Sequence, residues 1–132
     1  MSRTLFDGPI ADRAQQAIDT FHPDVVRDVQ AAVGRDQVVV VGMAWNPHVA
    51  QARKALDEAN IGYTYLEYGS YVSQWKERLA IKMWSGWPTF PQVYVSGTLI
   101  GGNARLREML KDGSLRTLLD ADKGEEKDNA AG

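Results

Sequence analysis

The run of four consecutive valines, Val38–Val41, constrains the fold of this 132-residue chain more than any other feature. Residues 37–42 read Gln-Val-Val-Val-Val-Gly, with no polar residue alternating with the apolar ones. An unbroken β-branched run is typical of a strand that is buried on both faces of its sheet. Such a sheet needs helices on each side, so the run predicts a layered α/β fold.

Hydrophobic periodicity predicts the elements around this strand. Helical spacing indicates a first helix over residues 9–20 and a second over 23–33, with Gly34 as its stop. After the valine run, apolar residues at helical spacing begin at Pro47. Residues 62–67 then read as a second strand.

The C-terminal half continues this alternation. Residues 91–95 and 98–100 flank a Ser-Gly pair, which predicts a β-hairpin. We expect Asn103 to cap the next helix and Ser114 to cap a short last one. The helix before the hairpin places Val72, Trp75, Leu79 and Met83 on one face. Its two tryptophans, Trp75 and Trp84, are expected in the core or at its boundary.

Length and charge define the organisation of the chain. At this length it forms one domain, which we expect over residues 23–120, with an N-terminal helical extension over 1–22. Residues 121–132 are acidic and lack apolar anchors, which predicts a disordered tail. The net charge is −2 and the tail carries all of it, so the body is about neutral and offers no basic surface for nucleic acid or an anionic membrane. No apolar run spans a bilayer and no secretory signal is recognisable, so we expect a cytoplasmic protein.

Three stretches of the sequence resemble the glutaredoxin family. They are residues 38–56, the segment Trp-Ser-Gly-Trp-Pro-Thr-Phe-Pro-Gln-Val-Tyr over 84–94, and Ser-Gly-Thr-Leu-Ile-Gly-Gly over 96–102. In layout the chain is most similar to the monothiol class. The resemblance implies a thioredoxin-like α/β/α sandwich with a four-stranded mixed sheet, here with an added N-terminal helix.

The resemblance also implies a ligand groove. In the family the bond before the position of Pro91 is cis, and the backbone of the preceding residue, here Phe90, pairs with an extended ligand, which is glutathione in glutaredoxins. The groove positions in this sequence would be Trp45, Asn46, Lys82, Thr89, Phe90, Pro91, Gly102 and Asn103. A solvated helix face is the alternative interpretation of Lys82.

The chain departs from the family at its reactive centre. It contains no cysteine, and the family's two active-site positions hold Asn46 and Val49. The family's lysine before the cysteine falls at Met43, and its acid after the Gly-Gly pair falls at Ala104. A carboxamide cannot form a mixed disulfide, and a chain without cysteine supplies no thiolate to an iron–sulfur cluster. We therefore expect no catalytic residue, no cluster and at most weak glutathione binding.

The residues at the turn allow more than one role. Asn46 is a good helix cap, an interpretation we favour over a catalytic role, and His48 in the first helical turn is expected to be solvent-exposed. Trp45 could anchor a partner or only fill the space left by lost ligand contacts. Neither histidine has a second ligand at metal-binding spacing, so no metal site is expected.

Two functions are consistent with these patterns. The first is a binding or regulatory module that has lost thiol–disulfide exchange and holds an unidentified protein or peptide partner in the groove. The alternative is a glutathione-dependent, transferase-like enzyme that uses the thiol of bound glutathione, oriented by Asn46 or Thr89.

Overall fold

A four-stranded sheet forms the centre of the computed structural model, which describes residues 6–121. Its strand order is β2-β1-β3-β4. Strand β1 (Val38–Gly42) runs parallel to β2 (Thr64–Glu67) and antiparallel to β3 (Gln92–Val95). Strand β4 (Thr98–Gly101) pairs with β3 through the predicted hairpin. The mixed sheet confirms the predicted thioredoxin-like architecture.

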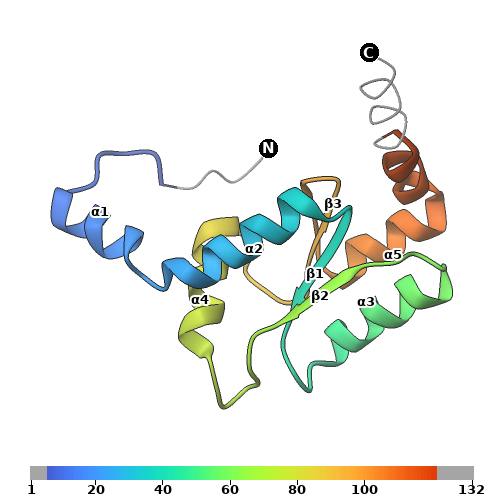
Figure 1. The fold of residues 1–132 in the computed structure, drawn as a ribbon, viewed down its shortest axis with the longest axis horizontal. Coiled ribbons are helices and arrows are strands. Elements are labelled where there is room, and N and C mark those ends of the chain that lie inside the picture. Colours follow the sequence, from blue (N-terminus) through green and yellow to red (C-terminus); the bar gives the residue numbers. More distant parts are fainter. Residues whose placement is uncertain (1–5, 122–132) are drawn as a thin grey trace.

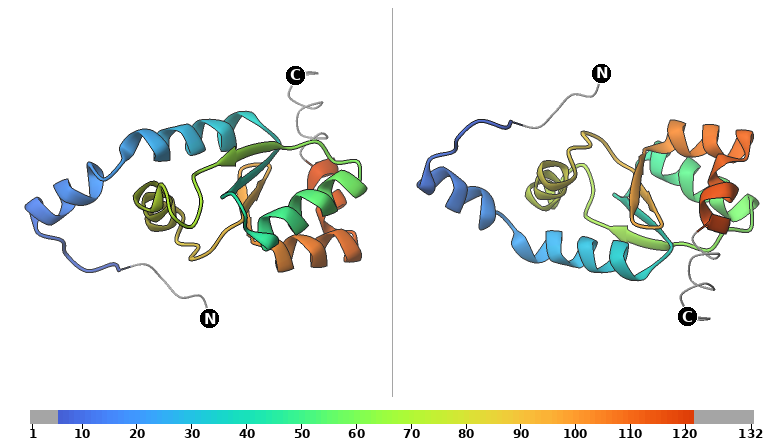
Figure 2. Two further views of the ribbon diagram at one scale, coloured as in Figure 1. Left: turned by 90° about the horizontal axis from the view of Figure 1, so that it is seen from below. Right: turned by 90° about the horizontal axis from the view of Figure 1, so that it is seen from above.

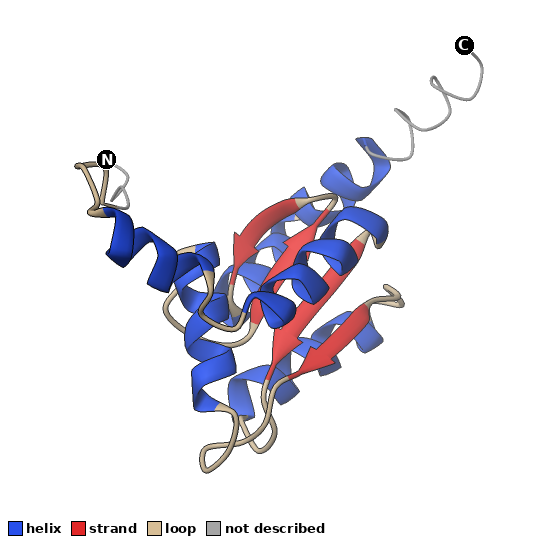
Figure 3. Cartoon of the chain, turned by 60° about the vertical axis from the view of Figure 1, so that its left-hand side comes forward, coloured by secondary structure: helices blue, strands red, loops and turns tan. Residues whose placement is uncertain are grey.

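Helices cover both faces of this sheet (Figures 1 and 2). Helices α2 (Pro23–Arg35) and α4 (Trp75–Ser85) pack on one face. Helices α3 (Pro47–Glu58) and α5 (Asn103–Asp112) pack on the other, together with the helical residues 114–121. The sheet therefore lies between two layers of helices, as the valine run predicts (Figure 3).

The valine run contributes to two separate cores. Val38 and Val40 pack with α3 and α5, whereas Val39 and Val41 pack with α2 and α4. All four are between 0% and 3% exposed. Because successive strand residues point to opposite faces, only a strand covered on both sides can bury every residue of such a run.

Helix α1 (Asp12–Asp19) precedes these layers and buries none of its side chains. It begins three residues later than the sequence predicts, since Pro9, Ile10 and the N-cap Ala11 precede it. In all the views α1 projects from the body of the domain (Figures 1, 2 and 3). The predicted acidic tail lies outside the described residues except for Ala121, which is helical.

Two predicted ends of the other helices are wrong. Gly34 does not stop α2, which continues through Arg35. Gly102 rather than Asn103 precedes α5 as its N-cap, and Asn103 is the first helical residue. Both errors concern helix ends, where neighbouring residues of similar propensity compete and tertiary packing decides the boundary.

The predicted inner face of α4 is also wrong. Trp75 is 59% exposed and Val72, which lies before the helix, is 87% exposed. The residues that α4 buries are Arg78, Ala80 and Ile81. The guanidinium of Arg78 donates to the carbonyl oxygens of Tyr68 and Ser73 at 3.0 and 2.6 Å, so burial leaves this cation partnered.

The described residues include no helix that is both long enough and apolar enough to cross a membrane.

Candidate ligand-binding groove

The loop between α4 and β3 forms one wall of a groove. The Phe90–Pro91 peptide bond in this loop is cis. Phe90 and Pro91 are buried, whereas Thr89 is exposed. Within the described residues, neither the amide N–H nor the carbonyl of Phe90 bonds to another backbone group. The loop therefore presents a donor and an acceptor that no neighbouring strand uses.

The turn between β4 and α5 forms the opposite wall. A Cβ atom added at Gly102 would lie 3.2 Å from the Pro91 carbonyl oxygen and 3.4 Å from Trp87 Nε1. The absence of a side chain at Gly102 lets the two walls approach closely. A hydrogen bond fixes the side chain of Asn103: its Nδ2 donates to Oε1 of Gln51 on α3 at 2.9 Å.

These two walls enclose a cleft of about 530 Å³. Five of the eight residues predicted for the groove line it: Thr89, Phe90, Pro91, Gly102 and Asn103. The other lining residues are His48, Trp87, Ala104, Arg105 and Glu108. His48 is exposed as predicted, but it also faces the cleft, because the first turn of α3 lies beside the loop.

The charged rim of the cleft was not predicted from the sequence. Arg105 and Glu108 lie one turn apart on α5, and Arg105 Nη1 is 3.3 Å from Glu108 Oε2. Arg105 lies three residues after the Gly-Gly pair, and Glu108 lies three residues after Arg105. This spacing could have indicated both residues, since it places them on one face of the helix. The first turn of α5 adds backbone N–H groups, which favour an anion.

Two polar atoms beside the cleft lack partners. Trp87 Nε1 and Asn103 Oδ1 are buried and form no hydrogen bond within the described residues. An unpaired buried polar atom costs about 1–3 kcal/mol. One of these atoms is a donor and the other an acceptor, and both belong to residues that line the cleft.

Asn46 caps α3. Its Oδ1 accepts hydrogen bonds from the backbone N–H groups of His48 at 2.8 Å and Val49 at 3.1 Å. Pro47 follows at the first helical position. The side chain therefore occupies the position of the family's nucleophile and satisfies two free donors of the helix end.

Trp45 lies on a different side of this turn from the cis-proline loop. It is 78% exposed, has a φ of 61°, and lines a second cleft together with Asn46, Arg53, Tyr65 and Glu67. The Arg53 guanidinium carbon is 3.9 Å from the centroid of the Tyr65 ring. Burial and the hydrogen bond to Glu67 raise the pKa of Tyr65 to about 12. The sequence does not indicate that Trp45 and His48 line different clefts, because residues 45–48 belong to one short turn.

Lys82 lines neither cleft. Its Nζ lies 5.6 Å from the centroid of the Phe90 ring, on the α4 side of the loop. At this distance the ammonium group is attracted to the face of the aromatic ring, so Lys82 interacts with the loop through Phe90.

Of the remaining departures from the family pattern, two are buried in the core and one is exposed at the cleft. Met43 is 6% exposed and Val49 3% exposed, and both belong to the core between the sheet, α2 and α4. Ala104 is exposed in the first turn of α5 and brings no charge to the cleft. The described residues contain no cluster of metal-ligating side chains.

Comparison with known proteins agrees with this arrangement. The glutaredoxin family model matches residues 38–100. A glutaredoxin-like protein of Dictyostelium discoideum is 50% identical over 98 residues, which cover 74% of this chain and 80% of the relative. Glutaredoxin 1 of Rickettsia conorii is 31% identical over 83 residues, or 63% of this chain and 80% of that protein.

Solved structures share the fold. Reduced glutaredoxin C1 from Populus tremula x tremuloides superposes with a TM-score of 0.70 at 20% identity, over 81% of this chain and 92% of that one. A complex of buckwheat glutaredoxin with glutathione gives a TM-score of 0.67 at 23% identity, over 76% and 92%. Together with the sequence relatives and the geometry of the groove, these matches show that the chain is a cysteine-free member of the glutaredoxin family.

Proposed function

We propose that this protein is a binding or regulatory module that holds an extended γ-glutamyl or peptide ligand in the cis-proline groove and performs no thiol–disulfide exchange. The observation that carries the proposal is Phe90, which lines a formed cleft and whose backbone N–H and carbonyl have no backbone partner within the described residues. An extended ligand can add to such a segment as a further strand. The Gly-Gly turn faces it at close range.

Loss of exchange chemistry follows from the residues at the turn. The atom at the nucleophile position is an amide oxygen that already accepts two helix N–H groups. Val49, at the family's second active-site position, is buried in the core. With no cysteine in the chain, neither a mixed disulfide nor a cysteine-ligated cluster can form on it.

The charges at the cleft favour a ligand with a carboxylate. Arg105 and the first turn of α5 provide a cation and free N–H groups at one end. Glu108 neutralises part of this charge. Met43 and Ala104 offer no charged contact, so we expect glutathione to bind weakly, with a dissociation constant of about 1 mM or higher.

Titration calorimetry with glutathione and S-methylglutathione tests this proposal. S-methylglutathione lacks a free thiol, so equal binding of both ligands shows that the groove holds the backbone and carboxylates without chemistry. We expect Arg105→Glu to weaken binding about tenfold. Arg107→Glu is the matched control, because Arg107 is exposed on the same helix and does not line the cleft.

Three results would count against the proposal. Absence of heat with either ligand and with γ-glutamyl peptides would show that the groove is vestigial. Equal loss with both arginine variants would place the ligand elsewhere. A transferase rate above buffer with glutathione and a chromogenic electrophile would favour the glutathione-dependent enzyme instead.

A further inference from the structure

Exposed apolar side chains are concentrated in two parts of the described chain. Apart from Trp45, every large apolar side chain that is strongly exposed lies either in residues 6–20 or in residues 71–83. We name residues 6–20 the N-terminal arm. We name Val72, Trp75, Leu79 and Met83 the α4 stripe; their exposed fractions range from 39% to 87%. Scattered exposed apolar residues are ordinary, but concentration of this kind marks an interaction surface.

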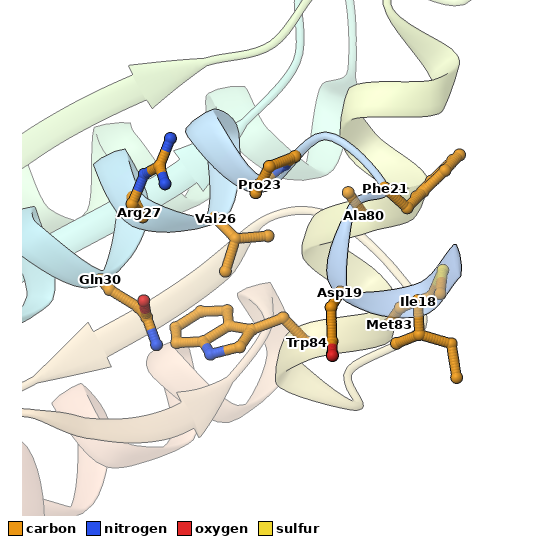
Figure 4. Close-up of a pocket in the computed structure, with 10 residues that line it drawn as sticks. All are labelled: Ile18, Asp19, Phe21, Pro23, Val26, Arg27, Gln30, Ala80, Met83 and Trp84. Carbon is orange, nitrogen blue, oxygen red and sulfur yellow. The ribbon is translucent and has the colours of Figure 1, made fainter. Parts of the chain in front are cut away.

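The α4 stripe continues into a hollow of about 320 Å³. Its walls come from the end of α1, from α2 and from α4, and include Ile18, Val26, Ala80, Met83 and Trp84 (Figure 4). Met83 belongs to both the stripe and the hollow. The stripe and the hollow therefore meet at Met83, where the exposed side of α4 adjoins the space between α1, α2 and α4.

The arm has an apolar surface of its own that nothing covers. Phe6 is 74% exposed, Ile10 38% and Ile18 44%, and no residue of α1 is buried. A helix of eight residues is too short to be stable in water without packing. The arm therefore needs a surface on which to bury its apolar side chains.

Charge makes the arm and α4 complementary. The arm carries three aspartates and one arginine, a net charge of −2. Among the charged side chains of α4 that are not buried, two lysines stand against one glutamate, a net charge of +1, because the guanidinium of Arg78 is buried against loop carbonyl oxygens. Lys76 is exposed and its Nζ is 5.6 Å from the ring of Trp75, so a cation flanks the largest apolar side chain of the stripe. An apolar centre with a charged rim is the usual anatomy of a protein interface.

The exit of the arm prevents it from lying along α4 of its own chain. The arm joins α2 through His22, which has a φ of 46° and whose Nδ1 is 3.7 Å from Glu77 Oε1. The ring of Phe21 stacks edge-on against the His22 ring, with centroids 5.0 Å apart. These contacts hold the arm pointing away from the body, so that, of its residues, Ile18 and Asp19 at its end line the hollow (Figures 2 and 4).

We propose that two copies of this chain form a symmetric dimer in which the N-terminal arm of each copy packs on the α4 stripe of the other. A two-fold axis makes both contacts at once, because each copy supplies one arm and one stripe. The interface lies outside the cis-proline groove, so the proposal does not depend on the proposed function.

Sedimentation equilibrium of the full chain tests the dimer. We expect a concentration-dependent dimer, and Trp75→Ala should raise its dissociation constant by about 30-fold or more. Trp45→Ala is the matched control, because it removes an even more exposed tryptophan from another surface and should leave self-association unchanged. A parent chain that stays monomeric at all concentrations, or equal effects of the two variants, would overturn the proposal.

Charge reversal identifies which surfaces meet. Asp12→Lys with Asp19→Lys makes the arm positive, and Lys76→Glu makes the rim of the stripe less positive. Each variant alone should dimerise more weakly than the parent, because the attraction between arm and stripe is weakened or reversed at both contacts. An equimolar mixture should form a heterodimer more tightly than either variant self-associates, since the positive arm then meets the altered stripe. Mixtures that associate no better than their components would show that the arm does not pack on α4.

Discussion

Replacing Asn46 with alanine tests whether the residue at the nucleophile position is a helix cap. The side chain accepts from the His48 and Val49 N–H groups, and alanine removes both bonds. The His48 N–H is exposed and can bond to water, whereas the Val49 N–H is partly buried and loses its partner. We therefore expect the free energy of unfolding to fall by about 1 kcal/mol, the usual cost of a lost cap.

Urea denaturation measures this loss. With a slope of about 2 kcal/mol per M, the midpoint should fall by about 0.5 M. Asn46→Asp is the matched control, because it keeps the acceptor and adds a negative charge at the helix N-terminus. It should leave stability unchanged or raise it by about 0.5 kcal/mol.

The cap interpretation would be refuted by either of two results. One is an Asn46→Ala variant as stable as the parent, which would mean that the two hydrogen bonds contribute nothing net. The other is an Asn46→Asp variant as unstable as Asn46→Ala, which would mean that the amide itself, rather than an acceptor, is required.

Three further perturbations probe the same region and the core. Asn46→Cys should produce a thiol whose pKa lies at least about one unit below its usual 8.5, because the same N–H groups stabilise the thiolate; the pH dependence of alkylation by iodoacetamide measures it, and an unshifted pKa would contradict the geometry. Burial raises the pKa of Tyr94 to about 12, so its contribution to stability is complete below pH 10 and is lost as the pH rises toward 12, by about 2 kcal/mol. Denaturation at several alkaline pH values should show this fall, and Tyr94→Phe should reduce it, with Tyr65 accounting for part of the fall that remains; a fall as large in Tyr94→Phe as in the parent would be the contrary result. Gly42→Ala should cost about 2 kcal/mol, because its Cβ would lie 2.7 Å from Val49 Cγ1. In a Val49→Ala background the same change should cost much less, whereas additive losses would mean that the two residues do not compete for space.

The structure explains why the cysteine-free turn is compatible with the fold. Met43 and Val49 are buried in the core and Asn46 caps α3, so three of the four departures contribute to stability. Only Ala104, exposed at the cleft, has no such contact. The turn has the composition expected of a helix start rather than of a reactive centre, which is consistent with a protein that binds without exchanging thiols.

Most of the fold and part of the groove could be predicted from the sequence. Val38–Val41 predict a doubly covered strand because period-2 geometry leaves no other way to bury four consecutive valines. The Asn46-Pro47 pair predicts a capped helix start from local hydrogen bonding alone. Such features depend on residues close together in the chain, and the structure confirms each of them.

Features that depend on distant residues could not be predicted. The apolar residues of α4 predict a helix, but their spacing does not say which side meets the sheet, and the buried side proved to be that of Arg78 and Ile81. Arg78 can be buried only because the carbonyl oxygens of Tyr68 and Ser73, from the preceding loop, accept its N–H groups. Likewise, Trp45 is two residues from Pro47 in sequence, yet the direction of the turn places it on a different surface from the groove.

The sequence by itself determined the order of strands and helices, the helix cap at Asn46 and the absence of a thiol, because each depends on residue type and short spacing. Tertiary structure alone decided which residues share the cleft and which apolar face stays exposed. Those outcomes depend on where segments far apart in the chain meet, and local propensity carries no information about that.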